Sequence, residues 1–190
     1  MISLHGSPYI GVFCAASDRY ALVPHFIDAK ESKRIGETLN VDVIPTSIGN
    51  SFLNGVLARG LGNKFCVASD IQDNEMDHLK SNGIHVHVLQ EISAIGNLLC
   101  VQKHAGIISP TISLEEKKDI EHFFDIPLHA MLIGKSELAG SSLIATEKGF
   151  LANPRASVEQ LETLEKLFRV AGMTTTANYG DPYVGNSILA

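Results

Sequence analysis

Short apolar runs alternate with longer amphipathic segments along the whole chain. Strict alternation of apolar and polar residues over residues 84–89 predicts a strand, whereas apolar residues at helical spacing over residues 158–168 predict a helix with one buried face. Four times the pattern runs through strand, strand, helix and strand in that order. This succession indicates an α/β protein built from copies of one ββαβ unit.

The pattern also predicts where the elements of each unit lie. Strands are predicted at residues 10–16, 20–23, 41–44, 52–60, 64–68, 84–89, 98–101, 106–110, 128–132, 142–145, 149–152 and 173–176. One helix is predicted over residues 28–39, and a second runs from Asp73 as its N-cap to the stop signal Asn82-Gly83. Two further helices follow capping boxes, in which Ser113 pairs with Glu116 and Ser157 pairs with Gln160.

A glycine-centred phrase recurs once in each unit. It occurs at residues 48–51, 95–98, 138–141 and 184–187, and its glycines are 47, 44 and 45 residues apart. This period lies in the range of stacked or ring-arranged supersecondary units. Because glycine and asparagine tolerate positive φ, each phrase predicts a tight corner between two strands. We expect the four corners to occupy corresponding places.

The phrases divide the chain into repeats. The predicted boundaries are 10–49, 50–96, 97–140 and 141–185, with residues 186–190 opening a fifth repeat, all within a single repeat domain over residues 1–190. Another ~35 to 40 residues are expected to complete the fifth repeat. A period near 45 also suits WD-type blades and HEAT units. An all-β WD-type blade has no place for the helix, and an all-helical HEAT unit has no place for the strands. A ring of ββαβ units is therefore preferred.

Composition narrows the class of partner. The chain has 190 residues, a hydrophobic fraction of 45% and a net charge of −6, and its cations are scattered. It lacks the basic stripe that would hold nucleic acid by electrostatics alone, so an RNA-rich partner would be reached through protein contacts or a basic patch assembled by folding. Residues 1–6 do not resemble a signal peptide, and no apolar run approaches the ~20 residues of a membrane span. We expect a cytoplasmic protein with no membrane partner.

The three cysteines stand in apolar runs. Cys14, Cys66 and Cys100 are an odd number and each lies in a predicted strand. This setting is typical of reduced, buried thiols rather than of a disulfide framework.

Several short motifs in a fixed order carry a family resemblance. They are Ile10-Gly11-Val12, Gly55, Gly62-Asn63-Lys64, Ser93-Ala94-Ile95-Gly96-Asn97, Ile107-Ile108-Ser109-Pro110, Leu138-Ala139-Gly140-Ser141 and Thr176-Ala177-Asn178-Tyr179-Gly180. In order and spacing they resemble the translation initiation factor 6 family of archaeal and eukaryotic ribosome anti-association factors. The resemblance implies a pentein-type α/β propeller with pseudo-fivefold symmetry, of which this chain has an incomplete fifth blade.

The resemblance also implies a function. A member of the family is not an enzyme; it binds the intersubunit face of the large ribosomal subunit and sterically prevents association with the small subunit, in translation initiation and large-subunit biogenesis. The implied partners are ribosomal proteins near the sarcin-ricin loop, with limited rRNA contact, and maturation factors and a translational GTPase for release. A monomer without cofactor or metal is expected. The predicted partner-binding residues are Gly11, Val12, Asn50, Gly55, Val56, Gly96, Asn97, Ser141 and Asn186.

Other interpretations of the same residues stay open. The Asn and Ser residues of the corners are also ordinary turn residues. His85 and His87 share one face of a strand and could begin a metal site, although solvent-facing histidines without a third ligand are the simpler interpretation. The acidic residues between 70 and 77 favour a helix N-terminus through its dipole rather than a cation site.

Two other function classes share the predicted fold. Pentein relatives include amidine hydrolases and amidinotransferases that use a Cys nucleophile with His and carboxylates, and a reactive thiolate of that kind needs an electropositive, partly open setting. A generic protein-binding scaffold is the third class, and binding to isolated large subunits separates it from a ribosome factor.

Overall fold

The structure, a computed structural model, describes residue 4 and residues 6–190. Four three-stranded sheets follow one another along the chain, and each is built by one ββαβ repeat. Within every sheet the first two strands are antiparallel and the third lies parallel to the second. The predicted fold class of repeated ββαβ units is therefore confirmed. Contacts group the chain into two compact units, Met1–Gly96 with Leu189–Ala190, and Asn97–Ile188.

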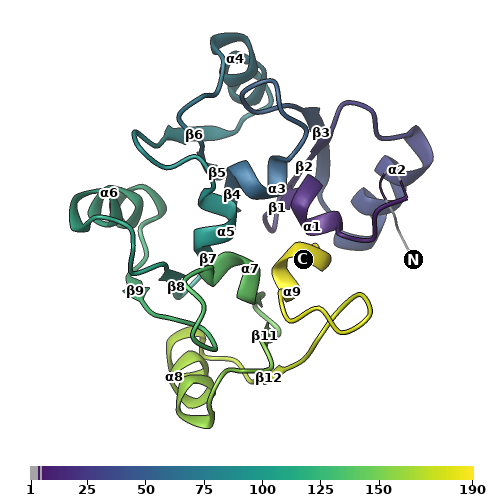
Figure 1. Cartoon of the computed structure of the whole chain (residues 1–190). Coiled ribbons are helices and arrows are strands. Elements are labelled where there is room, and N and C mark those ends of the chain that lie inside the picture. Colours follow the sequence, from purple (N-terminus) through teal and green to yellow (C-terminus); the bar gives the residue numbers. More distant parts are fainter. Residues whose placement is uncertain (1–3, 5) are drawn as a thin grey trace. The chain divides into compact units, whose positions relative to one another are not determined.

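The first unit contains the first two sheets. The first repeat comprises α1 (Ile10–Phe13), β1 (Ala15–Ala16), β2 (Tyr20–Pro24), α2 (Ala29–Leu39) and β3 (Asp42–Thr46). The second comprises α3 (Asn54–Leu57), β4 (Ala58–Leu61), β5 (Lys64–Val67), α4 (Asp73–Ser81) and β6 (His85–Val88). Figure 1 shows α2 and α4 each lying beside the sheet of its own repeat. The unit ends in the first half of α5 (Ile95–Leu98).

The second unit contains the other two sheets and begins in the second half of α5. Its first repeat continues with β7 (Leu99–Gln102), β8 (Ala105–Ile108), α6 (Leu114–Phe124) and β9 (Leu128–Ala130). The next repeat comprises α7 (Ala139–Ser142), β10 (Leu143–Ala145), β11 (Phe150–Ala152), α8 (Val158–Phe168) and β12 (Gly172–Thr174), and α9 (Val184–Ser187) follows. Each predicted repeat thus contains one sheet, while the prediction of a single domain stays a prediction.

Neighbouring repeats share a hydrophobic core within each unit. In the first unit, Leu22 of the first sheet packs in one cluster with Phe65 and Leu79 of the second repeat, and all three side chains are fully buried. In the second unit, Ile107 packs in one cluster with residues of the next repeat, among them Phe168. Because each sheet buries part of its apolar surface against the next repeat, one repeat depends on its neighbour for stability.

The apolar runs that open the repeats are not continuous strands. The predicted strands at residues 10–16 and 52–60 begin instead with the one-turn helices α1 and α3, and the strand predicted from residue 98 begins at Leu99, after α5. A single helical turn is too short to produce a 3.6-residue periodicity, so the sequence pattern could not distinguish it from an apolar strand. The prediction was wrong at these places because the turn is imposed by packing.

The predicted corners between strands are also corrected. Only the phrase at residues 48–51 forms a turn, in which Gly49 and Asn50 have φ values of +60° and +58° and Ile48 pairs with Ser51. The phrases at residues 95–98, 138–141 and 184–187 lie in or against the short helices α5, α7 and α9. The glycines at equivalent positions of the short helices are Gly11, Gly55, Gly96, Gly140 and Gly185, spaced by 44, 41, 44 and 45 residues.

The long helices begin close to their predicted starts. Ser157 and Gln160 form the predicted capping box of α8. At α6 only half of the predicted box forms: the Ser113 hydroxyl accepts the Glu116 N–H at 3.2 Å, but the Glu116 side chain does not accept the Ser113 N–H. At α4 the predicted N-cap is off by one residue, because Gln72 and Glu75 form the capping box and Asp73 is the first helical residue. The predicted stop at Asn82 is confirmed as the C-cap.

Candidate partner-binding surface

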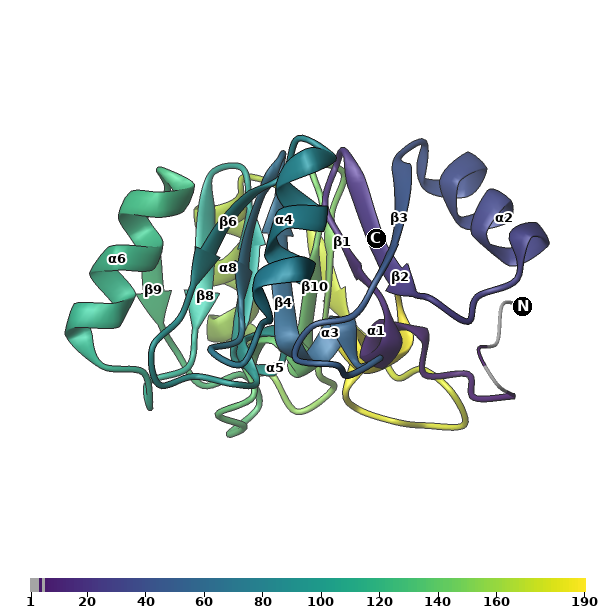
Figure 2. The ribbon, with the colours of Figure 1, turned by 90° about the horizontal axis from the view of Figure 1, so that it is seen from above.

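The short helices of the first unit pack backbone against backbone. Figure 2 shows α1 and α3 side by side at one end of the strands, and the structure places them in contact. A Cβ atom built on Gly55 would lie less than 3.0 Å from the carbonyl oxygens of Gly11 and Cys14. A Cβ atom on Gly96 would overlap in the same way with the carbonyl of Gly55. Glycine is therefore required where one short helix meets the backbone of the preceding one.

The second unit repeats this arrangement in α7 and α9. The two helices are in contact, as Figure 1 shows, and a Cβ atom on Gly185 would overlap with the carbonyl oxygen of Gly140. In this unit the Ser141 hydroxyl donates a hydrogen bond to Asn97 Oδ1 at 3.1 Å, so residues from α5 and α7 are joined. Each unit thus presents a row of one-turn helices whose spacing is set by glycine contacts.

The predicted binding residues separate into two groups in the structure. Gly55, Gly96 and Ser141 are buried and act as packing residues in this structure, and their role as direct contacts stays a prediction. Gly11, Val12 and Val56 are half-buried on α1 and α3, and Asn97 and Asn186 are half-buried on α5 and α9. Asn50 is exposed, but it lies in the turn before α3 and not on a short helix.

A buried carboxylate holds the Asn50 turn in place. Glu75, only 6% exposed, accepts hydrogen bonds from the Ser47 hydroxyl at 2.6 Å and from the N–H groups of Gly49, Asn50 and Gln72 at 2.7, 2.9 and 2.9 Å. Burial raises the pKa of the Glu75 carboxyl, but these four hydrogen bonds together outweigh it, so the pKa lies below its ordinary value. Glu75 is therefore ionised at neutral pH and accepts these hydrogen bonds as a carboxylate.

The sequence pattern missed several exposed residues beside the short helices. Lys135 occupies a four-residue turn like that of Asn50, and Tyr179 occupies a corresponding turn that is one residue longer; their φ values are +71° and +63°. In the first unit, Phe52 is 52% exposed and its ring lies 6.1 Å from that of Phe13 and 5.6 Å from that of Phe26. Gly134 and Gly180, next to Lys135 and Tyr179, could have indicated these turns in the sequence. Phe52 stands in an apolar run, and such a pattern does not indicate that a residue is exposed.

Possible metal ligands do not assemble among the described residues. No group of three or more His, Cys, Asp or Glu side chains suitable for an ion occurs in that part of the chain. His85 is exposed and His87 is half-buried on β6. The two histidines therefore have no third ligand from the described residues.

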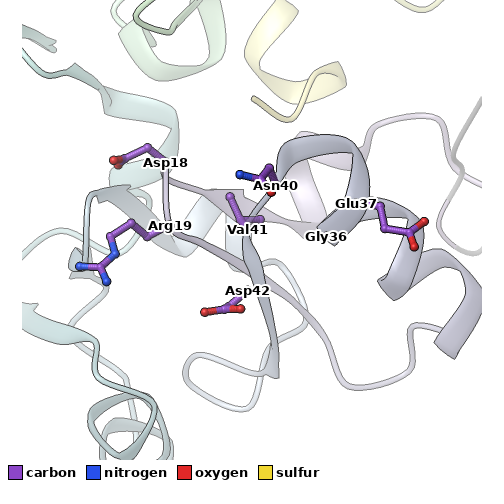
Figure 3. Close-up of a pocket in the computed structure, with 7 residues that line it drawn as sticks. All are labelled: Asp18, Arg19, Gly36, Glu37, Asn40, Val41 and Asp42. Carbon is purple, nitrogen blue, oxygen red and sulfur yellow. The ribbon is translucent and has the colours of Figure 1, made fainter.

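An open hollow lies at the end of α2. Its volume is about 470 Å³ and it is lined by Asp18, Arg19, Gly36, Glu37, Asn40, Val41 and Asp42. Figure 3 shows the side chain of Glu37 turned away from those of Asp18 and Arg19, so the charged groups do not converge on one point. This arrangement does not resemble an acid–base pair aimed at a substrate.

The three thiols are buried, as predicted. Cys14 is 2% exposed, and burial, together with the nearby Glu31 carboxylate, raises the pKa of its thiol to about 12. Cys66 and Cys100 are 0% and 2% exposed. A nucleophilic cysteine needs a lowered pKa and access to substrate, so this environment is opposite to that of a catalytic thiol.

We expect all three thiols to react slowly with a maleimide in native buffer and rapidly in denaturant. The physical reason is that the thiolate form is scarce and the sulfur atoms are covered. Mass spectrometry of timed samples measures the reaction, with the denatured protein as the control for complete labelling. Fast labelling of one thiol in the folded protein would contradict the expectation and favour the amidine hydrolase class.

Comparison with known proteins decides the family. Residues 1–190 match the eIF-6 family over their full length. The chain belongs to the eIF-6 family. Among eIF-6 relatives, Translation initiation factor 6 of Pyrococcus abyssi is 36% identical over 196 residues, which cover 100% of this chain and 86% of that protein. Its counterpart in Haloquadratum walsbyi is 30% identical over 190 residues, with 99% and 84% covered.

A solved structure supports the fold of this eIF-6 family member. Dimethylarginine dimethylaminohydrolase, a pentein-fold enzyme solved as an adduct with S-methyl-L-thiocitrulline, superposes with a TM-score of 0.54. The match has 16% identity and covers 88% of this chain and 69% of that one, so it shows the fold alone. The predicted pentein type is thereby confirmed. No helix in the described part of the chain is long and apolar enough to cross a bilayer.

Proposed function

We propose that this eIF-6 family member binds the large ribosomal subunit on its intersubunit face and sterically prevents association with the small subunit. Its direct contacts would be ribosomal proteins near the sarcin-ricin loop with limited rRNA contact. We further propose that it acts in the cytoplasm as a monomer in translation initiation and large-subunit biogenesis. In this proposal it has no catalytic activity, and maturation factors and a translational GTPase release it.

The match to the eIF-6 family over residues 1–190 carries this proposal. The short helices add a physical argument, because backbone contacts at Gly55, Gly96 and Gly185 hold them without side-chain freedom. A surface that is already ordered loses little conformational entropy when a partner binds. Such a surface suits a protein that blocks another by occupying its binding face.

The proposal is tested with purified ribosomal subunits. The protein is expected to sediment with isolated large subunits but not with small subunits, and to reduce subunit joining measured by light scattering. Inhibition should require no nucleotide or other substrate. Sedimentation with neither subunit would leave the generic scaffold class as the explanation.

Replacement of Asn97 by Arg is expected to weaken large-subunit binding at least tenfold with little change in Tm. Asn97 is half-buried on α5, so a longer charged side chain at this position projects into the proposed interface, while the fold loses only the bond from Ser141. That bond contributes about 1 kcal/mol to stability. Co-sedimentation at increasing subunit concentration measures the affinity.

Ser141→Ala is the matched control for Asn97→Arg. It removes the same hydrogen bond from a side chain that is 2% exposed and adds nothing to the surface. Binding close to that of the unaltered protein is expected for Ser141→Ala. Equal losses of binding in the two variants would mean that the hydrogen bond, and not the surface of α5, controls affinity.

A further inference from the structure

The second and fourth repeats hold equivalent turns by the same device. In the second repeat Glu75, three residues after the N-cap of α4, accepts the N–H groups of Gly49 and Asn50 at 2.7 and 2.9 Å. In the fourth repeat Gln160 has the same place in α8 and accepts the Gly134 N–H at 3.2 Å. In both repeats a polar side chain of the long helix thus reaches the turn that precedes the short helix.

The turn that Glu75 holds has an unfavourable backbone conformation. Gly49 and Asn50 are consecutive residues with φ values of +60° and +58°. Asparagine enters this left-handed region more readily than most residues, but still at a cost that surrounding contacts must offset. We therefore expect the turn to adopt other conformations when the carboxylate of Glu75 is removed.

An exposed turn does not need a buried carboxylate for its hydrogen bonds. Asn50 is exposed, and Ser47 and Gly49 are half-buried, so water could bind their polar groups. These three residues nevertheless supply three of the four donors to Glu75, which is 6% exposed and lies 25 to 28 residues later in the chain. Burying a charged group is unfavourable unless hydrogen bonds compensate. The charge of Glu75 thus fixes a surface segment and not a part of the core.

The turn is also tied to the start of α3. Ile48 pairs with Ser51 across the turn, and the buried Asn54, the first residue of α3, donates from Nδ2 to the Thr46 carbonyl at 3.1 Å. The position of the exposed Asn50 is therefore fixed relative to both α3 and α4. Helix α3 belongs to the row of one-turn helices that supports the proposed function.

We propose that Glu75 is a positioning residue for large-subunit binding, which acts by holding Asn50 in the conformation that the partner contacts. The inference rests on the proposed function and adds a buried residue that the partner does not touch. A turn that is already ordered loses less conformational entropy on binding than a free one. Loss of the carboxylate should therefore weaken binding even when the protein is fully folded.

A purely structural role for Glu75 predicts a different result. In that case Glu75→Ala would lower the Tm but leave the affinity of the folded protein unchanged. Glu121 provides a matched control, because its carboxylate also accepts a backbone N–H, that of Leu128 at 2.7 Å, and pairs with Lys117 at 2.9 Å. These contacts join α6 to the first residue of β9 and hold no turn before a short helix. Glu121→Ala is therefore expected to lower the Tm without changing the affinity for large subunits.

Affinity and hydrogen exchange are measured on the same variants. Co-sedimentation gives the Kd for large subunits at a temperature where circular dichroism shows each variant to be folded. Glu75→Ala is expected to bind about tenfold more weakly than the unaltered protein. Glu75→Gln keeps one acceptor oxygen and should lie between the two, and it carries the comparison alone if Glu75→Ala does not fold. Exchange of the Gly49 and Asn50 N–H groups should accelerate in both variants. Unchanged exchange or unchanged affinity would overturn the inference.

A double-variant cycle tests whether Glu75 acts through the turn. Asn50→Gly removes the exposed side chain and leaves a residue that tolerates positive φ. If Glu75 positions Asn50, the double variant with Glu75→Gln should bind about as weakly as the weaker single variant, whereas additive losses would overturn the inference. If the unaltered protein does not bind large subunits, the proposed function itself falls. Equal binding by the unaltered protein and the Glu75 variants removes only the positioning role.

Discussion

Gly55→Ala is expected to lower the free energy of unfolding by about 3 kcal/mol or more. The new methyl group would lie less than 3.0 Å from the carbonyl oxygens of Gly11 and Cys14. These are backbone atoms, so no side-chain rotation can relieve the overlap, and α1 and α3 must move apart. Urea unfolding followed by circular dichroism measures the loss, and large-subunit binding should fall with it at concentrations where the variant is folded.

Gly62→Ala is the matched control. Gly62 has a φ value of +59°, and a Cβ atom there would meet nothing within 4 Å. Alanine at that position is therefore strained only by its own backbone, which costs about 1 to 2 kcal/mol. A loss at Gly55→Ala no larger than at Gly62→Ala would contradict the close helix packing described above.

Glu75→Ala is expected to destabilise the protein by about 3 kcal/mol at neutral pH. The substitution leaves the Ser47 hydroxyl and the N–H groups of Gly49, Asn50 and Gln72 without their acceptor. Some of these donors will bind water when the turn relaxes, so the loss is smaller than four separate hydrogen bonds. The free energy of unfolding in urea, compared with that of the unaltered protein, provides the measurement.

Glu75→Gln separates the charge of Glu75 from its shape. Gln160 shows how an amide fits the equivalent place, since it accepts the N–H groups of Gly134 and Ser157 and donates to the Leu132 carbonyl at 2.6 Å. Glutamine at position 75 should therefore cost only about 1 to 1.5 kcal/mol. A loss as large as that of Glu75→Ala would mean that both carboxylate oxygens are needed as acceptors, since the amide NH2 puts a donor where one oxygen accepts two hydrogen bonds.

The lowered pKa of Glu75 determines how the free energy of unfolding changes with pH. The pKa of Glu75 is lowered in the folded protein from an ordinary value of 4.5, so the folded state binds the proton less tightly than the unfolded state. The stabilisation is fully present above the unfolded pKa and is lost as pH falls through the folded pKa. The stability difference between the unaltered protein and Glu75→Gln should therefore be constant near neutral pH and shrink below about pH 4.

The repeats keep their backbone contacts and differ in the residues they expose. Glycine stands at the same place of every short helix, from Gly11 to Gly185. Two residues before each long-helix N-cap, by contrast, the exposed residues are Phe26, Asp70, Thr111 and Arg155. One scaffold position thus offers an aromatic, an acidic, a hydroxyl and a basic side chain. A partner can distinguish the repeats by these residues although their backbones are equivalent.

The long helices, the central strands and the repeat order followed from the sequence alone. Helix α8 has its capping box at Ser157 and Gln160 and an apolar stripe that includes Leu164 and Phe168, and both features depend on residues within a few positions of each other. The burial of the three thiols was equally local, because each stands in an apolar run. Periodicity and capping chemistry express such short-range preferences directly.

Only the tertiary structure decided whether each glycine-centred phrase forms a turn or a helix, and which residues are exposed at the surface. Whether Gly96 lies in a turn or a helix depends on its contact with the carbonyl of Gly55, 41 residues earlier in the chain. The local sequence pattern carries no information about that contact. The burial of Ser141 and the exposure of Phe52 likewise depend on which element lies against each residue. Local preference determined the repeated unit, and contacts between distant segments determined what each unit presents to a partner.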